Sequence, residues 1–262
     1  MKPEELRRRS AEGKFNQPTT GFCDGFVQAN LVALPERYAK DFETFCHQNP
    51  KPCPLLEVVG PRAHKTRQLA ADADLINTVP RYLIWKDGEV HDEVQEISRY
   101  YREDLVFFLL GCSFSFEEAL IKSGIRLRHV DRKQNVSMYR TNISLQPAGP
   151  FAGEMVVSMR PVHHRSVAKA CAITAHYPGV HGEPIHVGYP EMIGIKDISR
   201  VDYGDPVSIE EGEIPVFWAC GVTPQNVLVQ SRLPFAITHA PGYMFVGDKR
   251  NEDFAHCSLE AR

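Results

Sequence analysis

Side chains that could hold and transform a small acid gather at two short stretches of this chain. Each stretch combines cysteine, glycine and hydroxyl residues: Gly111-Cys112-Ser113 in one and Cys220-Gly221-Val222-Thr223 in the other. Free backbone N–H groups at the start of a helix bind carboxylates and phosphates. Two such helix starts beside one cleft would suit a small acid with two carboxylates.

Proton transfer needs a group that titrates near neutral pH, and His239 is the first choice because histidine does so. The alternative for His239 is a core histidine with a satisfied hydrogen bond. Glu117 falls in the first turn of a predicted helix and could face either the cleft or solvent. Arg160 could clamp a carboxylate with two hydrogen bonds, or form a surface ion pair.

The densest group of titratable residues is His181, Glu183 and His186. Their spacing, H-x-E-x-x-H, could place three ligands on one metal ion, but Pro184 prevents a regular helix here. We therefore expect these residues to act in acid–base chemistry or to shape a loop. We expect no metal ligands and no cofactor, and a divalent metal is the alternative left open.

Five further residues are candidates for contact with a substrate. Cys112 and Ser113 could donate hydrogen bonds to an oxyanion, although a buried cysteine more often serves packing. Ser115 is expected at a helix start, and Thr223 and Gln225 at the second one. Two other polar residues inside an apolar stretch, Gln28 and Asn30, are interpreted as partners of backbone groups at a bend.

The elements that position the first group are a strand, a tight turn and a helix. Leu105–Leu110 is an unbroken apolar run, which is typical of a strand buried on both faces of a parallel sheet. Ser115 and Glu118 form the pattern of a capping box, and Gly124 is placed to end the helix. Residues 214–228 repeat this order, with Thr223 as the predicted N-cap and Pro224 in the first helical position.

The rest of the chain alternates helical and strand patterns. Helices are predicted over residues 2–12, 35–48 and 161–176, strands over 136–145 and 155–159, and a hairpin over 81–90. We expect an α/β fold: a larger three-layer α/β domain with an inserted smaller two-layer α+β domain. The main domain would take residues 1–125 and 183–262, and the insertion residues 126–182.

Composition limits the partners and the location. The chain has 262 residues, a formal net charge of −3 and no long basic block, so we expect no nucleic acid partner. The longest apolar runs are too short to span a bilayer, so no membrane partner is expected either. Seven scattered cysteines without a C-x-x-C pair favour reduced thiols in the cytoplasm. A homo-oligomer is left open.

Several blocks, taken together, resemble the hydro-lyase family related to D-glutamate cyclase. They are residues 25–32, 111–120, 156–161, 181–186, 216–225 and 238–242. The resemblance implies a lyase that removes water from a small amino or hydroxy acid; D-glutamate cyclase converts D-glutamate to 5-oxo-D-proline. A dehydratase for another carboxylic acid and a non-catalytic sensor of small acids are the alternatives.

The chain departs from the family pattern at two positions. Tyr189 and Asn77 stand where the resemblance leads us to expect aspartate. If either aspartate belonged to the site, the substrate or the activity would differ. No Gly-rich dinucleotide fingerprint or P-loop is present, so no organic cofactor is expected.

Overall fold

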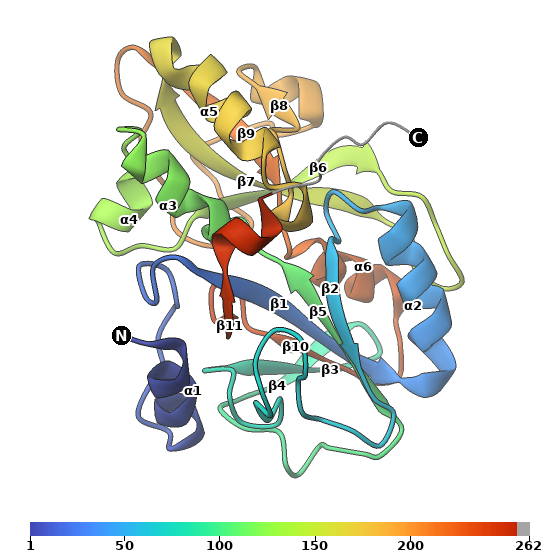
Figure 1. Ribbon diagram of the computed structural model, residues 1–262. Coiled ribbons are helices and arrows are strands. Elements are labelled where there is room, and N and C mark those ends of the chain that lie inside the picture. The colour runs from blue at the N-terminus through green and yellow to red at the C-terminus, as the bar shows by residue number, and fades with distance from the viewer. Residues whose placement is uncertain (256–262) are drawn as a thin grey trace, which may run out of the picture.

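The structure is a computed structural model that describes residues 1–255. Two antiparallel sheets make up its centre, one lying across the end of the other, with helices around them (Figure 1). The larger sheet has the order β2-β5-β1-β10-β3-β4, and β11 also pairs with β1. Its strands are β1 (Phe26–Pro35), β2 (Leu55–Val59), β3 (Tyr82–Lys86), β4 (Glu89–Val94), β5 (Leu105–Gly111), β10 (Ala236–His239) and β11 (Phe245–Arg250).

The smaller sheet has the order β6-β7-β9-β8. Its strands are β6 (Ser137–Ser144), β7 (Glu154–His163), β8 (His186–Val187) and β9 (Glu213–Ala219). Two of these strands, β6 and β7, come from the segment predicted as an insertion, and two come from beyond residue 182. The domain boundaries stay a prediction.

The helices are α1 (Pro3–Ala11), α2 (Glu36–Gln48), α3 (Phe114–Lys122), α4 (Arg128–Asp131), α5 (Val167–Ala175) and α6 (Thr223–Ser231). Short 3-10 turns are η1 (His164–Ser166), η2 (Pro178–Val180), η3 (Pro190–Ile193) and η4 (Asn251–Phe254). The helices predicted over residues 2–12 and 35–48 and the hairpin over 81–90 are confirmed. No helix within residues 1–255 is long and apolar enough to cross a membrane.

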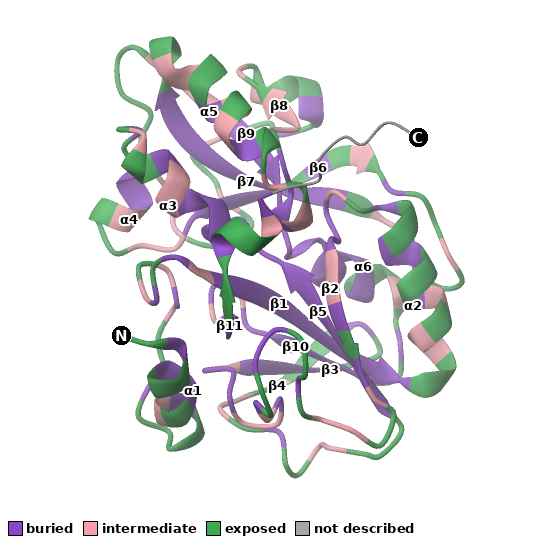
Figure 2. Cartoon of the chain, in the orientation of Figure 1, coloured by how far each residue is buried: buried purple, intermediate pink, exposed green. Residues whose placement is uncertain are grey.

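The mixed α/β class is confirmed, but the expected parallel pairing of Leu105–Leu110 is wrong, since β5 pairs antiparallel with both β1 and β2. The apolar run has another cause. Leu105, Phe107 and Leu109 join one hydrophobic core, and the alternate residues, beginning with Val106, join a second core on the other face. Figure 2 shows β1 and β5 buried along their length. The pattern therefore reports burial on both faces and not strand direction.

Both helix starts differ from their predicted caps. Helix α3 begins at Phe114, so Ser113 precedes it and Ser115 lies inside its first turn, where no capping box forms. The hydroxyl of Ser115 instead accepts a hydrogen bond from the backbone N–H of Gln28 at 3.1 Å. Helix α6 begins at Thr223, one residue earlier than predicted. A backbone group of β1, and not the start of α3 itself, is thus the partner of the Ser115 hydroxyl.

The helix predicted over residues 161–176 is wrong in its first part. Strand β7 continues to His163, and the helix begins only at Val167. Pro161 stands opposite Pro215 in the β7–β9 ladder, where neither residue has an N–H group to donate. Because the two prolines face each other, neither leaves an acceptor on the other strand without its N–H partner, and the strand continues through Pro161. From the sequence, Pro161 alone indicated the start of a helix.

Candidate functional site

The starts of α3 and α6 meet at one small cavity of about 20 Å3, which we call the inner cavity. This volume has room for a single water molecule. Both cysteine turns line it, together with residues of β1, β6 and the segment before β11. The lining residues are Asn30, Cys112, Ser113, Phe114, Asn135, Val136, Met138, Cys220, Gly221, Val222, Gly242 and Met244. The two helix starts thus lie at one place, as the sequence suggested.

The two turns approach this closely because Gly221 has no side chain and because Asn30 joins them. A Cβ atom on Gly221 would lie 1.8 Å from Nδ2 of Asn30, whereas one on Gly111 would lie 2.3 Å from the carbonyl oxygen of Gly179 in η2. The same Nδ2 donates a hydrogen bond to the Gly111 carbonyl at 2.7 Å. The interpretation of Asn30 as a partner of backbone groups is therefore confirmed.

Arg160 is fully buried directly behind the start of α3. Its Nε and Nη2 donate to Oε1 of Glu117 at 3.0 and 2.5 Å, and Nη2 also donates to Oγ of Ser113 at 3.0 Å. Its Nη1 donates to Oγ of Ser158 at 2.9 Å. Arg160 therefore belongs to a buried charged network, and the alternative of a surface ion pair is wrong.

Glu117 is the negative centre of this network, and it is buried. Burial by itself raises the pKa of Glu117, but His129 and Arg160 outweigh it and lower the pKa to about 2. The carboxylate is therefore ionised at neutral pH, so Nε2 of His129, at 2.9 Å, donates to it. All of its hydrogen bonds fall on Oε1, which leaves Oε2 without a partner among the described residues.

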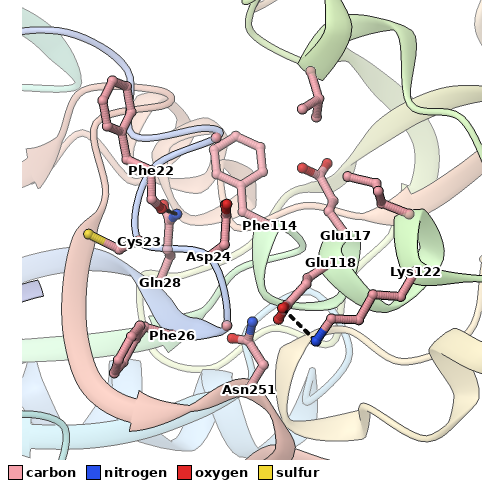
Figure 3. Close-up of a pocket in the computed structure, with 14 residues that line it drawn as sticks. Phe22, Cys23, Asp24, Phe26, Gln28, Phe114, Glu117, Glu118, Lys122 and Asn251 are labelled. Carbon is pink, nitrogen blue, oxygen red and sulfur yellow. Dashed lines mark hydrogen bonds and ion pairs between the residues drawn. The ribbon is translucent and has the colours of Figure 1, made fainter. Parts of the chain in front are cut away.

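A second, larger cavity of about 260 Å3 lies beside α3, and we call it the outer cavity (Figure 3). Phe22 and Asp24 lie on one side of it, and Glu117, Glu118 and Lys122 of α3 lie on the other. The lining residues are Gly21, Phe22, Cys23, Asp24, Gly25, Phe26, Gln28, Phe114, Glu117, Glu118, Ile121, Lys122, Val130 and Asn251. Lys122 pairs with Glu118 at 2.6 Å, whereas Oδ1 of Asn251 is buried without a partner in the described part of the chain. Glu118 is paired with Lys122 and Glu117 with Arg160, so Asp24 is the one carboxylate of this cavity without an ion pair among the described residues, and it favours a cationic group on a ligand.

The two cysteines of the inner cavity are held as thiols. Burial raises the pKa of Cys112 well above its ordinary value and that of Cys220 to about 11. A protonated thiol is a weak donor and a poor nucleophile. Cys112 can thus donate to a ligand oxygen, but the environment does not activate it for covalent attack.

Three of the predicted substrate-binding residues serve the backbone instead of lining either cavity. Ser115 holds the N–H of Gln28, as described above. Oγ1 of Thr223 donates to the Cys220 carbonyl at 2.7 Å and accepts from the N–H of Val156 at 3.1 Å. Nε2 of Gln225 donates to the His239 carbonyl at 2.8 Å. These bonds fix the helix starts in place.

His239 lies at the end of β10, buried, and lines neither cavity. Its Nδ1 lies 3.1 Å from the backbone nitrogen of Leu31 and 3.2 Å from the Leu31 carbonyl oxygen, and its Nε2 has no partner within residues 1–255. Burial lowers the pKa of His239 to about 4, so its ring is neutral at pH 7. The structure does not bring His239 to the helix starts.

The predicted cluster of His181, Glu183 and His186 is dispersed. His181 is fully buried, with Nδ1 2.7 Å from the Lys51 carbonyl, and burial lowers its pKa to about 4. Glu183 forms an ion pair with the Lys51 side chain, and Nε2 of His186 donates to the Tyr189 carbonyl at 3.0 Å. No group of three or more His, Cys, Asp or Glu residues within residues 1–255 is arranged to hold a metal ion.

The two departures from the family pattern also lie outside both cavities. Tyr189 is 71% exposed on the smaller sheet's edge, and Asn77 is half-buried in the segment before β3. Neither position would bring an aspartate to the inner or outer cavity in this structure.

Sequence reasoning missed several residues of the site: Ser158 and His129 beside the Glu117–Arg160 pair, and in the outer cavity Asp24, Phe114, Lys122 and Asn251 among others. Ser158 lies two residues before Arg160 on β7, so the alternation of a strand could have placed the two on one face. His129 and Asn251 carry no comparable signal, because both come from short elements: His129, 12 residues after Glu117, from a four-residue helix, and Asn251 from a 3-10 turn.

Comparisons with known proteins bear on the whole chain. A family model described as D-glutamate cyclase matches residues 106–248, which is more than half of the chain. A protein named "Putative hydro-lyase" from Natranaerobius thermophilus is 52% identical over 250 residues, covering 95% of this chain and 96% of its own. "Putative hydro-lyase" from Rubrobacter xylanophilus is 53% identical over 250 residues, with the same coverage of both chains. "Putative hydro-lyase blr2921" from Bradyrhizobium diazoefficiens is 52% identical over 253 residues, covering 97% and 93%.

Proposed function

We propose, on the premise that this chain belongs to the D-glutamate cyclase family, that it is a hydro-lyase converting D-glutamate to 5-oxo-D-proline and water. Family membership supports a lyase. The observation that carries the choice of site is the meeting of two helix starts at one cavity, with the buried Glu117–Arg160 pair directly behind. Helix starts favour a carboxylate, and Glu117 favours an ammonium group.

The proposed reaction sets three requirements. The α-amino nitrogen bonds to the γ-carboxyl carbon, and one carbon–oxygen bond of that carboxyl group breaks. The ammonium nitrogen gives up two protons, and both leave with the carboxyl oxygen as water. The site must therefore accept two protons from nitrogen, stabilise the oxyanion and return both protons to the departing oxygen.

Ser113 and Cys112 are suited to the oxygen side of this reaction. Oγ of Ser113 accepts from Arg160, so its own hydroxyl hydrogen stays available for a substrate oxygen. The Cys112 thiol is a second donor at the same cavity, since burial keeps it protonated. Arg160 does not line the cavity and acts through Ser113, which makes it a positioning residue.

Glu117 is suited to the nitrogen side. Its unpartnered Oε2 belongs to a residue that lines the outer cavity, where it can accept a hydrogen bond from the substrate ammonium group. Ser113 and Glu117 stand four residues apart on one face of the α3 start, and both contact Nη2 of Arg160. In the proposed binding mode the amine lies at Glu117, which lines the outer cavity, and the carboxyl group approaches Ser113, which lines the inner one.

Size supports the outer cavity as the place where the substrate body binds. At about 260 Å3 it has room for a five-carbon amino acid, whereas the inner cavity at about 20 Å3 holds only one water molecule. The reaction as proposed uses no organic cofactor and no partner besides a small carboxylic acid, and we place it in the cytoplasm. The alternatives are a dehydratase for another acid and a non-catalytic sensor.

Turnover of D-glutamate tests this proposal. Purified protein is incubated with D-glutamate, with and without a chelator, and 5-oxo-D-proline is measured by mass and chirality. Product should form in proportion to protein, and Ser113→Ala should lower kcat by about 100-fold or more, as loss of an oxyanion donor does. Ser115→Ala is the matched control, because Ser115 lines neither cavity. Absence of product from both D- and L-glutamate would reject the proposed reaction, and stabilisation by D-glutamate without turnover would favour a sensor.

A further inference from the structure

Phe114 is the one residue within residues 1–255 that lines both cavities. It is the first residue of α3 and directly follows Ser113. Its side chain packs into a small hydrophobic cluster that includes Cys112, Cys220 and Met244. The ring therefore forms a wall between the outer cavity and the two helix starts.

The wall matters because the two cavities contain different groups that a substrate would need. The inner cavity holds the donors of both helix starts but has no room for an acid. The outer cavity has the room and contains Glu117, but the turn residues Cys112, Cys220 and Gly221 do not line it. A carboxyl group that enters through the outer cavity reaches the turn residues only if the Phe114 ring moves or if the group passes its edge.

We propose that the Phe114 side chain is the door between the outer and inner cavities, and that it sets how long an acid can be while still reacting. The role of Phe114 as the door is inferred from the geometry of the two cavities alone. The rule on length rests on the proposed function, because it assumes that the acid's amine stays at Glu117 while its carboxyl group approaches Ser113.

The door is tested by cysteine labelling, which needs no substrate. Cys112 and Cys220 line the inner cavity, and each is 6% exposed. Methyl methanethiosulfonate is applied at pH 8, and labelling at each cysteine is followed by mass spectrometry of peptides. Phe114→Ala should raise the labelling rate of Cys112 by about tenfold or more, because the two cavities then become continuous.

Two variants and two reference cysteines separate opening of the door from unfolding of the protein. Ile121→Ala changes a residue that lines the outer cavity only and should leave the rate at Cys112 unchanged. Phe114→Trp should slow labelling at Cys112. Cys46 and Cys53 are buried in a different core, so a rise at these positions reports unfolding of the whole protein. Equal rates at Cys112 in wild type, Phe114→Ala and Phe114→Trp, with all three folded, would overturn the door.

The rule on length is tested by comparing D-glutamate with D-2-aminoadipate, which has one more methylene group. Phe114→Leu, which retains an apolar side chain, and Phe114→Ala should shift the kcat/KM ratio about tenfold toward the longer acid. An unchanged kcat/KM ratio in active variants would overturn the rule on length. The proposal that Phe114 is the door would then still be decided by the labelling experiment. Wild-type protein inactive on both acids would reject the proposed function and the length rule together, while labelling still decides the door.

Discussion

Replacing Glu117 with glutamine removes the negative charge of the buried network while keeping the shape of the side chain. Arg160 then stays buried without its counter-ion, whose Oε1 lies 2.5 Å from Nη2 in the wild type. Breaking a buried pair by removing one partner costs about 3–5 kcal/mol. We expect the free energy of unfolding of Glu117→Gln at pH 7 to fall by that amount.

The loss should shrink in acid. Burial raises the pKa of Glu117, yet His129 and Arg160 lower it overall from 4.5 to about 2. A carboxyl group with a depressed pKa in the folded state stabilises above its unfolded pKa and loses that contribution as the pH falls toward the folded value. This difference corresponds to about 3 kcal/mol, of which about 1 kcal/mol disappears between pH 5 and pH 3.5.

Urea unfolding at pH 7, 5 and 3.5, followed by tryptophan fluorescence, measures this effect. The gap in unfolding free energy between wild type and Glu117→Gln should narrow by about 1 kcal/mol from pH 5 to pH 3.5. Glu118→Gln is the matched control, since it removes only a surface pair with Lys122 and should cost less than about 1 kcal/mol at pH 7. A gap that is the same at all three pH values would refute the reasoning, because Glu117 would then have an ordinary pKa in the folded protein.

Three further predictions follow from the site. Gly221→Ala brings a Cβ atom to 1.8 Å from Nδ2 of Asn30, so thermal unfolding should show a loss of about 1–3 kcal/mol that Asn30→Ala partly reverses. His239→Ala should lower the unfolding free energy by about 1–3 kcal/mol by leaving the Leu31 N–H unpaired, while kcat per folded molecule is retained. Tyr189→Asp should leave kcat and KM for D-glutamate unchanged, because the side chain is exposed and outside both cavities.

Each of these has a contrary outcome. A fully stable Gly221→Ala protein would mean that the two turns separate easily. Loss of turnover in folded His239→Ala would return His239 to the role of proton-transfer group that its residue type suggested. A gain of activity in Tyr189→Asp would place the smaller sheet's edge at the substrate.

The elements around the site were largely predictable, because local signals specify them. The apolar run of residues 105–110 predicts the buried strand that the structure contains, and Gly111 and Gly124 mark the turn and the end of the helix. The strand's partners were not predictable, since burial on both faces is compatible with either direction. The extent of β7 depends on the facing pair Pro161 and Pro215, which only the completed sheet reveals.

The site itself was predictable as a set of residue types but not as a network. Ser113, Glu117 and Arg160 were candidates from their positions beside predicted turns and strands. Their assembly requires β7 to bring Arg160 against α3, a contact between positions more than forty residues apart. His129 enters through a four-residue helix without any motif, so nothing in the sequence indicated this contact, which helps to lower the pKa of Glu117.

A crystal structure with 5-oxo-D-proline bound tests the central claim most directly. We predict that the product lies in the outer cavity, with its lactam nitrogen toward Glu117 and its lactam oxygen toward Ser113 and Cys112 at the start of α3. Product bound away from both helix starts, in crystals of protein that turns over D-glutamate, would contradict it.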